Sequence, residues 1–169
     1  SLIPHTAGMV AWWRGEGDGT DSAGAHNGVL DRVGFRARGD VRAFSFDGQG
    51  SVTVPDHPGL RPGIGRYWGV SAWIRARGGG PDRMVVVEKT GTGMGDSVAF
   101  TLSQGRPAIE WAGQTFEISG TVPDLRDGEW HIVSWMVRPA RDRAYVSIDE
   151  VLDSWPVPLP AQPATSPAV

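Results

Sequence analysis

The sequence predicts an all-β protein whose strands form an antiparallel sandwich of two sheets. Short apolar runs recur about every 8–15 residues, the spacing typical of strands in such sandwiches. Between the runs lie 24 Gly and 13 Pro, residues that favour turns and interrupt helices. No segment has the apolar periodicity of a helix, and 169 residues suit one domain with a full core.

The composition excludes several classes of protein. A net charge of −3 and a pI near 5.8 give no electrostatic basis for binding nucleic acid. The chain has no Cys, which excludes disulfides and thiolate metal sites. No apolar run approaches the ~20 residues of a membrane-spanning helix, and residues 1–5 lack the features of a signal peptide. We therefore expect no nucleic-acid partner and no membrane span.

The N-terminal segments are predicted to be a strand and a long loop. Residues 9–14 are apolar and predict the strand. The loop at residues 15–28 is rich in Gly and Asp and has almost no apolar surface to bury. Long loops of this kind are usually functional or held by other contacts.

A β-hairpin is predicted at residues 43–55. Phe44 and Phe46 alternate with smaller residues, which gives the first half of the hairpin one apolar face. Asp47-Gly48 supplies the residues that a tight turn needs. We expect both Phe side chains to face the core.

Seven further strands are predicted, at residues 67–75, 84–88, 98–102, 108–111, 115–118, 130–137 and 145–152. Gln104-Gly105 predicts a turn between the third and the fourth of them. In the first, alternate residues from Trp68 to Ile74 share one apolar face. The run Met-Val-Val-Val-Glu at residues 84–88 is typical of a strand buried on both faces. Five Pro follow Trp155, which favours a linker or a tail lying along a sheet edge.

Motifs occur in a characteristic order at residues 10–13, 17–28, 43–48, 52–56, 70–74, 127–133 and 145–152. In this order they resemble the laminin-G-like, concanavalin A-like jelly-roll domains common as modules of large secreted bacterial proteins. The resemblance implies an N-terminal extension at residues 1–8, a laminin-G-like sandwich at 9–155 and a Pro-rich tail or linker at 156–169.

The sequence departs from that family in two places. Asp149-Glu150 stands where the family has an Asp-Gly turn, and the Pro-rich tail stands where its closing strand begins. Either the chain is cut short, or the tail or a partner covers the exposed edge, since an open edge promotes aggregation.

Catalytic motifs are missing from the sequence. Glucanases of related families carry a Glu-x-Asp-x-x-Glu run, whereas Glu110, Glu117 and Glu129 stand singly here. No His lies near a Gly-x-Ser-x-Gly nucleophile motif. His131, inside an apolar strand, is predicted to be a hydrogen-bonded core histidine. We therefore expect no enzyme activity.

A structural calcium ion is one candidate ligand. Glu16, Asp18, Asp21 and Asn27 place oxygen ligands among flexible Gly carbonyls, although their spacing is not that of an EF-hand. The resemblance implies a structural Ca²⁺ in this loop and favours Asp21 and Asn27 as ligands. The alternative is a solvated acidic turn that the Asp21 side chain caps.

Carbohydrate is the other candidate ligand. Trp111 stands beside Glu110, and Trp68 ends a loop, so both rings are candidates for stacking on sugars. The alternative is that they fill the core.

The fold resemblance and the missing catalytic groups predict a non-catalytic recognition or adhesion module. It would belong to a larger secreted or cell-surface protein, bind carbohydrate or a protein partner and contact other domains of its parent chain. Alternatives are a structural accessory domain that packs on a catalytic domain and, less favoured, a glycoside hydrolase.

Overall fold

The computed structural model describes residues 8–61, 68–91, 97–111, 113–117, 122–138, 143–149 and 155–158. Every strand pair in these ranges is antiparallel, and their one helical turn is a 3₁₀ helix, η1 (Pro58–Leu60). The all-β prediction is confirmed. Within these ranges no helix has the length and apolar character needed to cross a membrane. The chain divides into two compact units, Ser1–Arg61 and Pro62–Val169.

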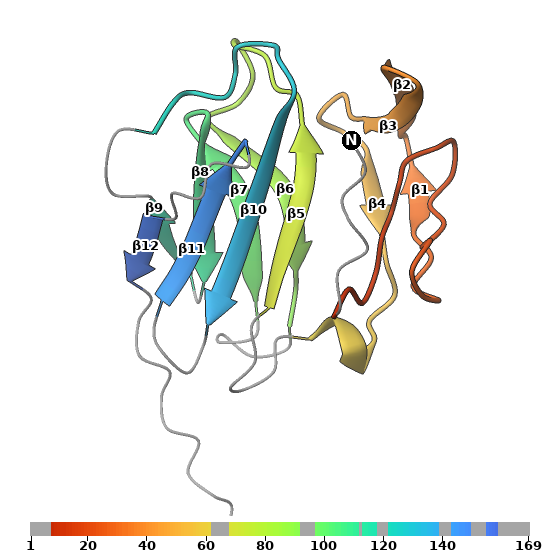
Figure 1. Ribbon diagram of the computed structural model, residues 1–169, viewed down its shortest axis with the longest axis horizontal. Helices are drawn as coiled ribbons and strands as arrows, with labels where there is room; N and C mark the ends of the chain where they lie inside the picture. The colour runs from red at the N-terminus through yellow and green to blue at the C-terminus, as the bar shows by residue number, and fades with distance from the viewer. Residues whose placement is uncertain are drawn as a thin grey trace, which may run out of the picture. The chain divides into compact units, whose positions relative to one another are not determined.

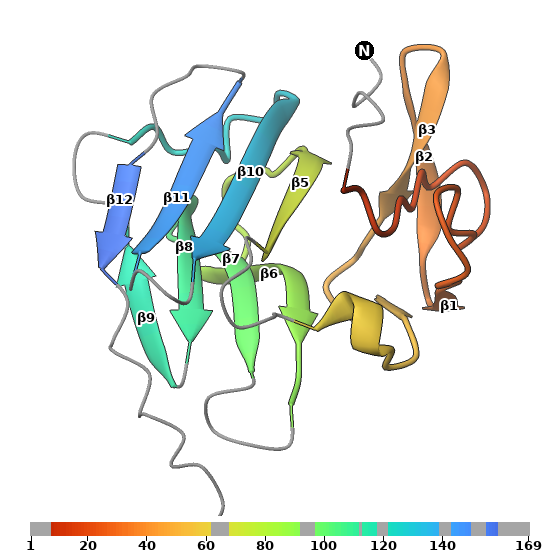
Figure 2. The same cartoon turned by 60° about the horizontal axis from the view of Figure 1, so that its bottom comes forward.

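The second unit contains two four-stranded sheets (Figure 1). One has the order β12-β11-β10-β5 and the other the order β6-β7-β8-β9. Their strands are β5 (Trp68–Ile74), β6 (Arg83–Lys89), β7 (Val98–Ser103), β8 (Arg106–Trp111), β9 (Gln114–Glu117), β10 (His131–Arg138), β11 (Arg143–Ile148) and β12 (Trp155–Pro158). Figure 2 shows the two sheets as separate layers.

One apolar core joins these two sheets. Phe100 and Ile109 enter it from β7 and β8, and Trp135 and Val146 enter it from β10 and β11. The Phe100 ring lies between Trp68 and Trp135, with ring centroids 5.3 and 5.9 Å apart. The predicted apolar face of β5 packs against the same core. A sandwich of two sheets is therefore present in this unit.

Strand β6 differs from the sequence prediction. It was expected to be buried on both faces, but Val85 is 44% exposed. The strand is at the edge of its sheet, and its pairing with β7 is irregular between Val85 and Val87. A bulge of this kind is common in edge strands and leaves part of the strand in solvent.

The turn between β7 and β8 agrees with the sequence prediction. Gln104 and Gly105 have φ angles of 48° and 80°, the sign that a two-residue turn needs to match the twist of its strands. A Cβ at Gly105 would also clash with the Asp124 carboxylate. This position therefore requires Gly.

The first unit contains two two-stranded sheets. Strand β1 (Val29–Asp31) pairs with β4 (Ser51–Thr53), and β2 (Gly34–Arg38) pairs with β3 (Val41–Ser45). The predicted hairpin at residues 43–55 is therefore wrong, because its two halves pair with earlier strands and not with each other.

Local turns explain this pairing. Strands β2 and β3 are joined by two residues, Gly39 and Asp40, which is a tighter connection than the one after β3. The Asp47 carboxylate accepts a hydrogen bond from the Gln49 N–H at 2.8 Å and turns the chain away from β3. Phe46 consequently lies outside the ladder and is 52% exposed, so its expected place in the core is wrong.

The strand predicted at residues 9–14 is also wrong. Among these residues only Trp13 forms a bridge, an isolated one with Asp21. The Trp12 N–H donates to the Asp21 carboxylate at 2.7 Å instead of to a neighbouring strand. The Asp21 side chain thus accepts the hydrogen bond that a neighbouring strand was expected to accept.

The start of the Pro-rich tail forms an edge strand. Residues 155–158 make up β12, in which Pro156 pairs with Tyr145 of β11. Pro has no N–H for a ladder and is tolerated at a sheet edge. Residues 155–158 therefore lie along a sheet edge, one of the two alternatives that the sequence left open. The end of the strand predicted at 145–152 and the tail beyond 158 lie outside the described residues.

Candidate functional site

The Asp21 side chain organises the predicted calcium loop. It is buried, with 4% of the residue exposed. Its Oδ1 accepts from the N–H groups of Trp12 (2.7 Å) and Ala23 (2.9 Å). Its Oδ2 accepts from the His26 N–H (3.1 Å) and lies 3.0 Å from the His26 ring Nδ1.

These contacts determine the charge of Asp21. Burial raises its pKa, but the N–H groups of Trp12, Ala23 and His26 and the His26 ring together lower the pKa well below its usual range. The carboxylate is therefore ionised at neutral pH. A depressed pKa means that this stabilisation is present above the ordinary Asp pKa and is lost as the pH falls through the folded value.

The other predicted calcium ligands also accept hydrogen bonds from the backbone. Asn27 Oδ1 accepts from the Asp21 N–H at 3.0 Å, and Asp18 Oδ1 accepts from the Thr20 N–H at 2.9 Å. Glu16 Oε2 accepts from the Arg42 N–H at 3.1 Å. All four predicted ligands thus accept backbone hydrogen bonds that stabilise the conformation of the loop.

A calcium ion at Asp21 does not fit this arrangement. Each of its carboxylate oxygens already has two N–H partners, so a cation would have to displace them. In the described part of the chain, no three His, Asp or Glu side chains gather as a metal-binding group. The contacts favour the side-chain cap at Asp21, and a structural calcium ion in this loop stays a prediction.

Both Trp residues predicted to bind sugar pack in the core of the second unit. Trp111 is 6% exposed, and Trp68 stacks on Phe100. Neither ring is placed as an open platform, so the alternative of core packing is favoured.

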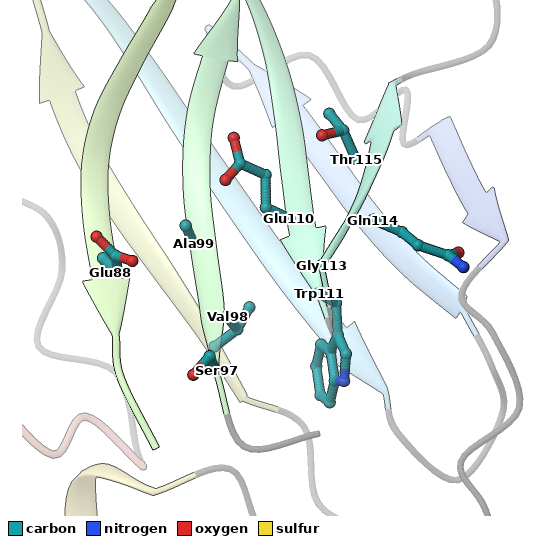
Figure 3. A pocket seen from close by; sticks show the side chains of 9 residues that line it. All are labelled: Glu88, Ser97, Val98, Ala99, Glu110, Trp111, Gly113, Gln114 and Thr115. Atoms are coloured by element: carbon teal, nitrogen blue, oxygen red, sulfur yellow. The ribbon is translucent and has the colours of Figure 1, made fainter. Parts of the chain in front are cut away.

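A shallow pocket of about 230 Å³ lies on the outer face of the β6–β9 sheet (Figure 3). Strand register places Glu88, Ala99, Glu110 and Thr115 in one row across its four strands. Figure 3 shows the first three on neighbouring strands, with the Trp111 ring directed away from the Glu110 carboxylate. Small Ala99 separates two carboxylates in the middle of the sheet.

Arg83 holds the Glu110 carboxylate in a two-point ion pair. Arg83 Nε and Nη2 donate to its two oxygens, each at 2.7 Å. Hydrogen bonding to Glu110 raises the pKa of Arg83. The sequence indicates Glu110 but neither Glu88 nor Arg83, because strand register aligns Glu88 with Glu110 and the Arg83 side chain reaches Glu110 from further along β6.

His131 lies between two carboxylates at the beginning of β10. Its ring is 14% exposed, its Nδ1 lies 2.7 Å from Asp149 Oδ2, and its Nε2 lies 3.1 Å from Asp127 Oδ1. Burial lowers the pKa of His131, but hydrogen bonds to Asp149 and Asp127 outweigh it and raise the pKa above its usual value. The predicted hydrogen bonding of this histidine is confirmed, but His131 is not one of the buried core residues.

This cluster makes stability depend on pH. A raised pKa means that protonated His131 stabilises the fold fully below the unfolded His pKa, near 6.5, and that this contribution is lost as the pH rises through the folded value. We expect the free energy of unfolding to fall across that window, by at most about 1.4 kcal/mol per pH unit for one proton. Urea denaturation between pH 5.5 and 9 measures this change in the free energy of unfolding. The H131Q variant is the control, and an equal slope in that variant contradicts the assignment.

Comparison with known proteins yields no relative: no family model, no curated protein and no solved structure matches this chain. The resemblance to laminin-G-like domains therefore rests on the order of the sequence motifs, and the function rests on the residues described above.

Proposed function

We propose that the chain is a non-catalytic recognition or adhesion module of a larger secreted or cell-surface protein. Its sandwich would be a laminin-G-like jelly roll, and its ligand would be carbohydrate or a protein partner. The order of the sequence motifs and the antiparallel sheets support this proposal, and a fold alone does not assign a ligand.

The observation that carries the proposal is the row of polar groups in the pocket on the β6–β9 sheet. Glu88, Glu110 and Thr115 offer carboxylates and a hydroxyl beside Ala99, which leaves space above the sheet. Gln114 adds an amide at the same pocket. Such groups bond sugar hydroxyls, and the open, shallow shape suits one or two sugar units or a short polar peptide segment.

The Arg83–Glu110 pair favours binding over glycoside hydrolysis. Hydrolysis needs one carboxylic acid that gives a proton to the leaving oxygen. Glu110 is held as an acceptor by two charge-assisted hydrogen bonds from Arg83. It is therefore placed to accept hydrogen bonds from a ligand and not to act as the acid.

A glycan array with the labelled full chain tests the proposal. We expect binding to a restricted set of glycans, weakened about tenfold or more in E88Q and E110Q, because a hydrogen bond to a charged group contributes about 1.5–3 kcal/mol. The matched control is E117Q, since Glu117 lies on the same sheet, bonds Ser103 at 2.7 Å and does not line the pocket.

Two results contradict this assignment. Absence of binding to every glycan removes the carbohydrate ligand and leaves a protein partner or the structural accessory role. Binding that E88Q and E110Q leave unchanged removes the pocket as its site.

A further inference from the structure

Two histidines from distant parts of the sequence meet in the first unit. His26 Nε2 lies 3.2 Å from His57 Nδ1, and the ring centroids are 4.7 Å apart. Both rings line a pocket of about 290 Å³ together with Asn27, Pro55 and Asp56. The contact joins the end of the acidic loop to the segment that begins η1.

The neighbours of each ring determine which nitrogen carries a proton. The Asp21 carboxylate only accepts hydrogen bonds, so His26 Nδ1, 3.0 Å away, carries the proton, and Nε2 of the neutral ring has a lone pair. His57 Nδ1 accepts from the Gly59 N–H at 3.0 Å and therefore also has a lone pair. The 3.2 Å contact between His26 Nε2 and His57 Nδ1 therefore needs a proton or a cation between the two rings.

A proton on His26 Nε2 can fill this contact as a hydrogen bond, and a metal cation can fill it as a bridge between the two nitrogens. Zn–N bonds of about 2.0–2.1 Å at the tetrahedral angle place two ligand nitrogens about 3.3–3.4 Å apart. The observed 3.2 Å is close to that separation. Imidazole nitrogens are common ligands of zinc and related divalent ions, whereas calcium prefers oxygen.

We propose that His26 Nε2 and His57 Nδ1 bind a divalent transition-metal ion of the Zn²⁺ class. Asp21 would orient the His26 ring from behind, as carboxylates do for metal-binding histidines. The ion would replace the hydrogen bond from the N–H of Gly59, an exposed residue at which water can take over as the acceptor. Two protein ligands leave the remaining positions to water, so the site is open and exchangeable.

This inference does not depend on the proposed carbohydrate pocket. Asn27 Oδ1 accepts from the Asp21 N–H, and the Asp56 carboxylate forms an ion pair with Arg61. Both side chains therefore have other partners, and the proposed metal site uses neither as a ligand. The alternative is a proton shared by the two imidazole rings, and the following experiment distinguishes it from a bound metal ion.

Calorimetric titration of the full chain with ZnCl₂ at pH 7.5 tests the site. We expect one Zn²⁺ per chain, with the ¹⁵N signals of His26 Nε2 and His57 Nδ1 shifted in NMR spectra. H57N should weaken binding at least about tenfold, while its Asn oxygen can still accept from the Gly59 N–H and keep η1 in place. The control H131Q should bind as the unmodified chain does.

Three outcomes overturn the proposal. The first is an unmodified chain that shows neither binding heat nor imidazole shifts, which leaves the shared proton as the occupant. The second is undiminished binding by a folded H57N variant. The third is loss of binding in H131Q, which would place the ion at His131 in the other unit.

Discussion

Replacement of Asp21 by Ala is expected to destabilise the first unit by about 3–5 kcal/mol, the range for breaking a buried hydrogen-bond network. The change leaves the N–H groups of Trp12, Ala23 and His26 without their acceptor, and it removes the partner of the His26 ring. Urea denaturation measures the loss. Amide hydrogen exchange localises it, and protection should fall at these three N–H groups.

The matched control for this change is D18A. Asp18 is in the same loop and is also a carboxylate, but it is exposed and caps only its local turn through the Thr20 N–H. Its urea midpoint should remain close to that of the unmodified chain. Equal losses in the two variants would contradict the role assigned to Asp21.

The same variants test the calcium prediction. A ligand that binds only the native state raises its stability, so calcium held in this loop must raise the Tm of the unmodified chain above its value in chelator. D18A should then reduce that increase. An unchanged Tm removes the structural calcium.

Replacement of Phe100 by Ala is expected to cost about 3–5 kcal/mol of stability in the second unit, the usual range for a fully buried Phe. Phe100 has no exposed surface, and its ring stacks between Trp68 and Trp135 from the facing sheet. The cavity left behind would lie between the two sheets, at the centre of the core. Near-UV circular dichroism of the Trp residues during thermal melting measures the effect.

Phe46 offers the matched comparison, because F46A removes the same atoms at a side chain that is 52% exposed. Its effect should be below about 1 kcal/mol, since little apolar surface returns to water. A loss as large as that of F100A would contradict the exposed placement of Phe46 and restore its predicted place in a core.

Features that one strand or one turn encodes by itself can be predicted from the sequence. The alternation from Trp68 to Ile74 placed one face of β5 correctly in the core. Gln104-Gly105 placed the β7–β8 turn, because that turn needs two positive φ angles. Both are local patterns that do not depend on distant partners.

Features that depend on which distant segments meet cannot be predicted in this way. The alternation of apolar residues at 43–55 predicts two strands, but it does not determine which strands they pair with. In the structure β3 pairs with β2, and β4 pairs with β1. The contact between His26 and His57 spans 31 residues and leaves no local pattern. Glu88 and Glu110 likewise come together only through strand register.

The order β12-β11-β10-β5 determines how this unit would respond to a pulling force. Register aligns Trp68 at the start of β5 with Val157 near the end of β12, by way of Val137 and Ala144. A pulling force applied at Trp68 and Val157 therefore acts at one end of this sheet. It would break the hydrogen bonds of the outer strands one after another instead of shearing all the bonds of a strand at once. The β6–β9 sheet, with its pocket, bears no tension until those strands separate.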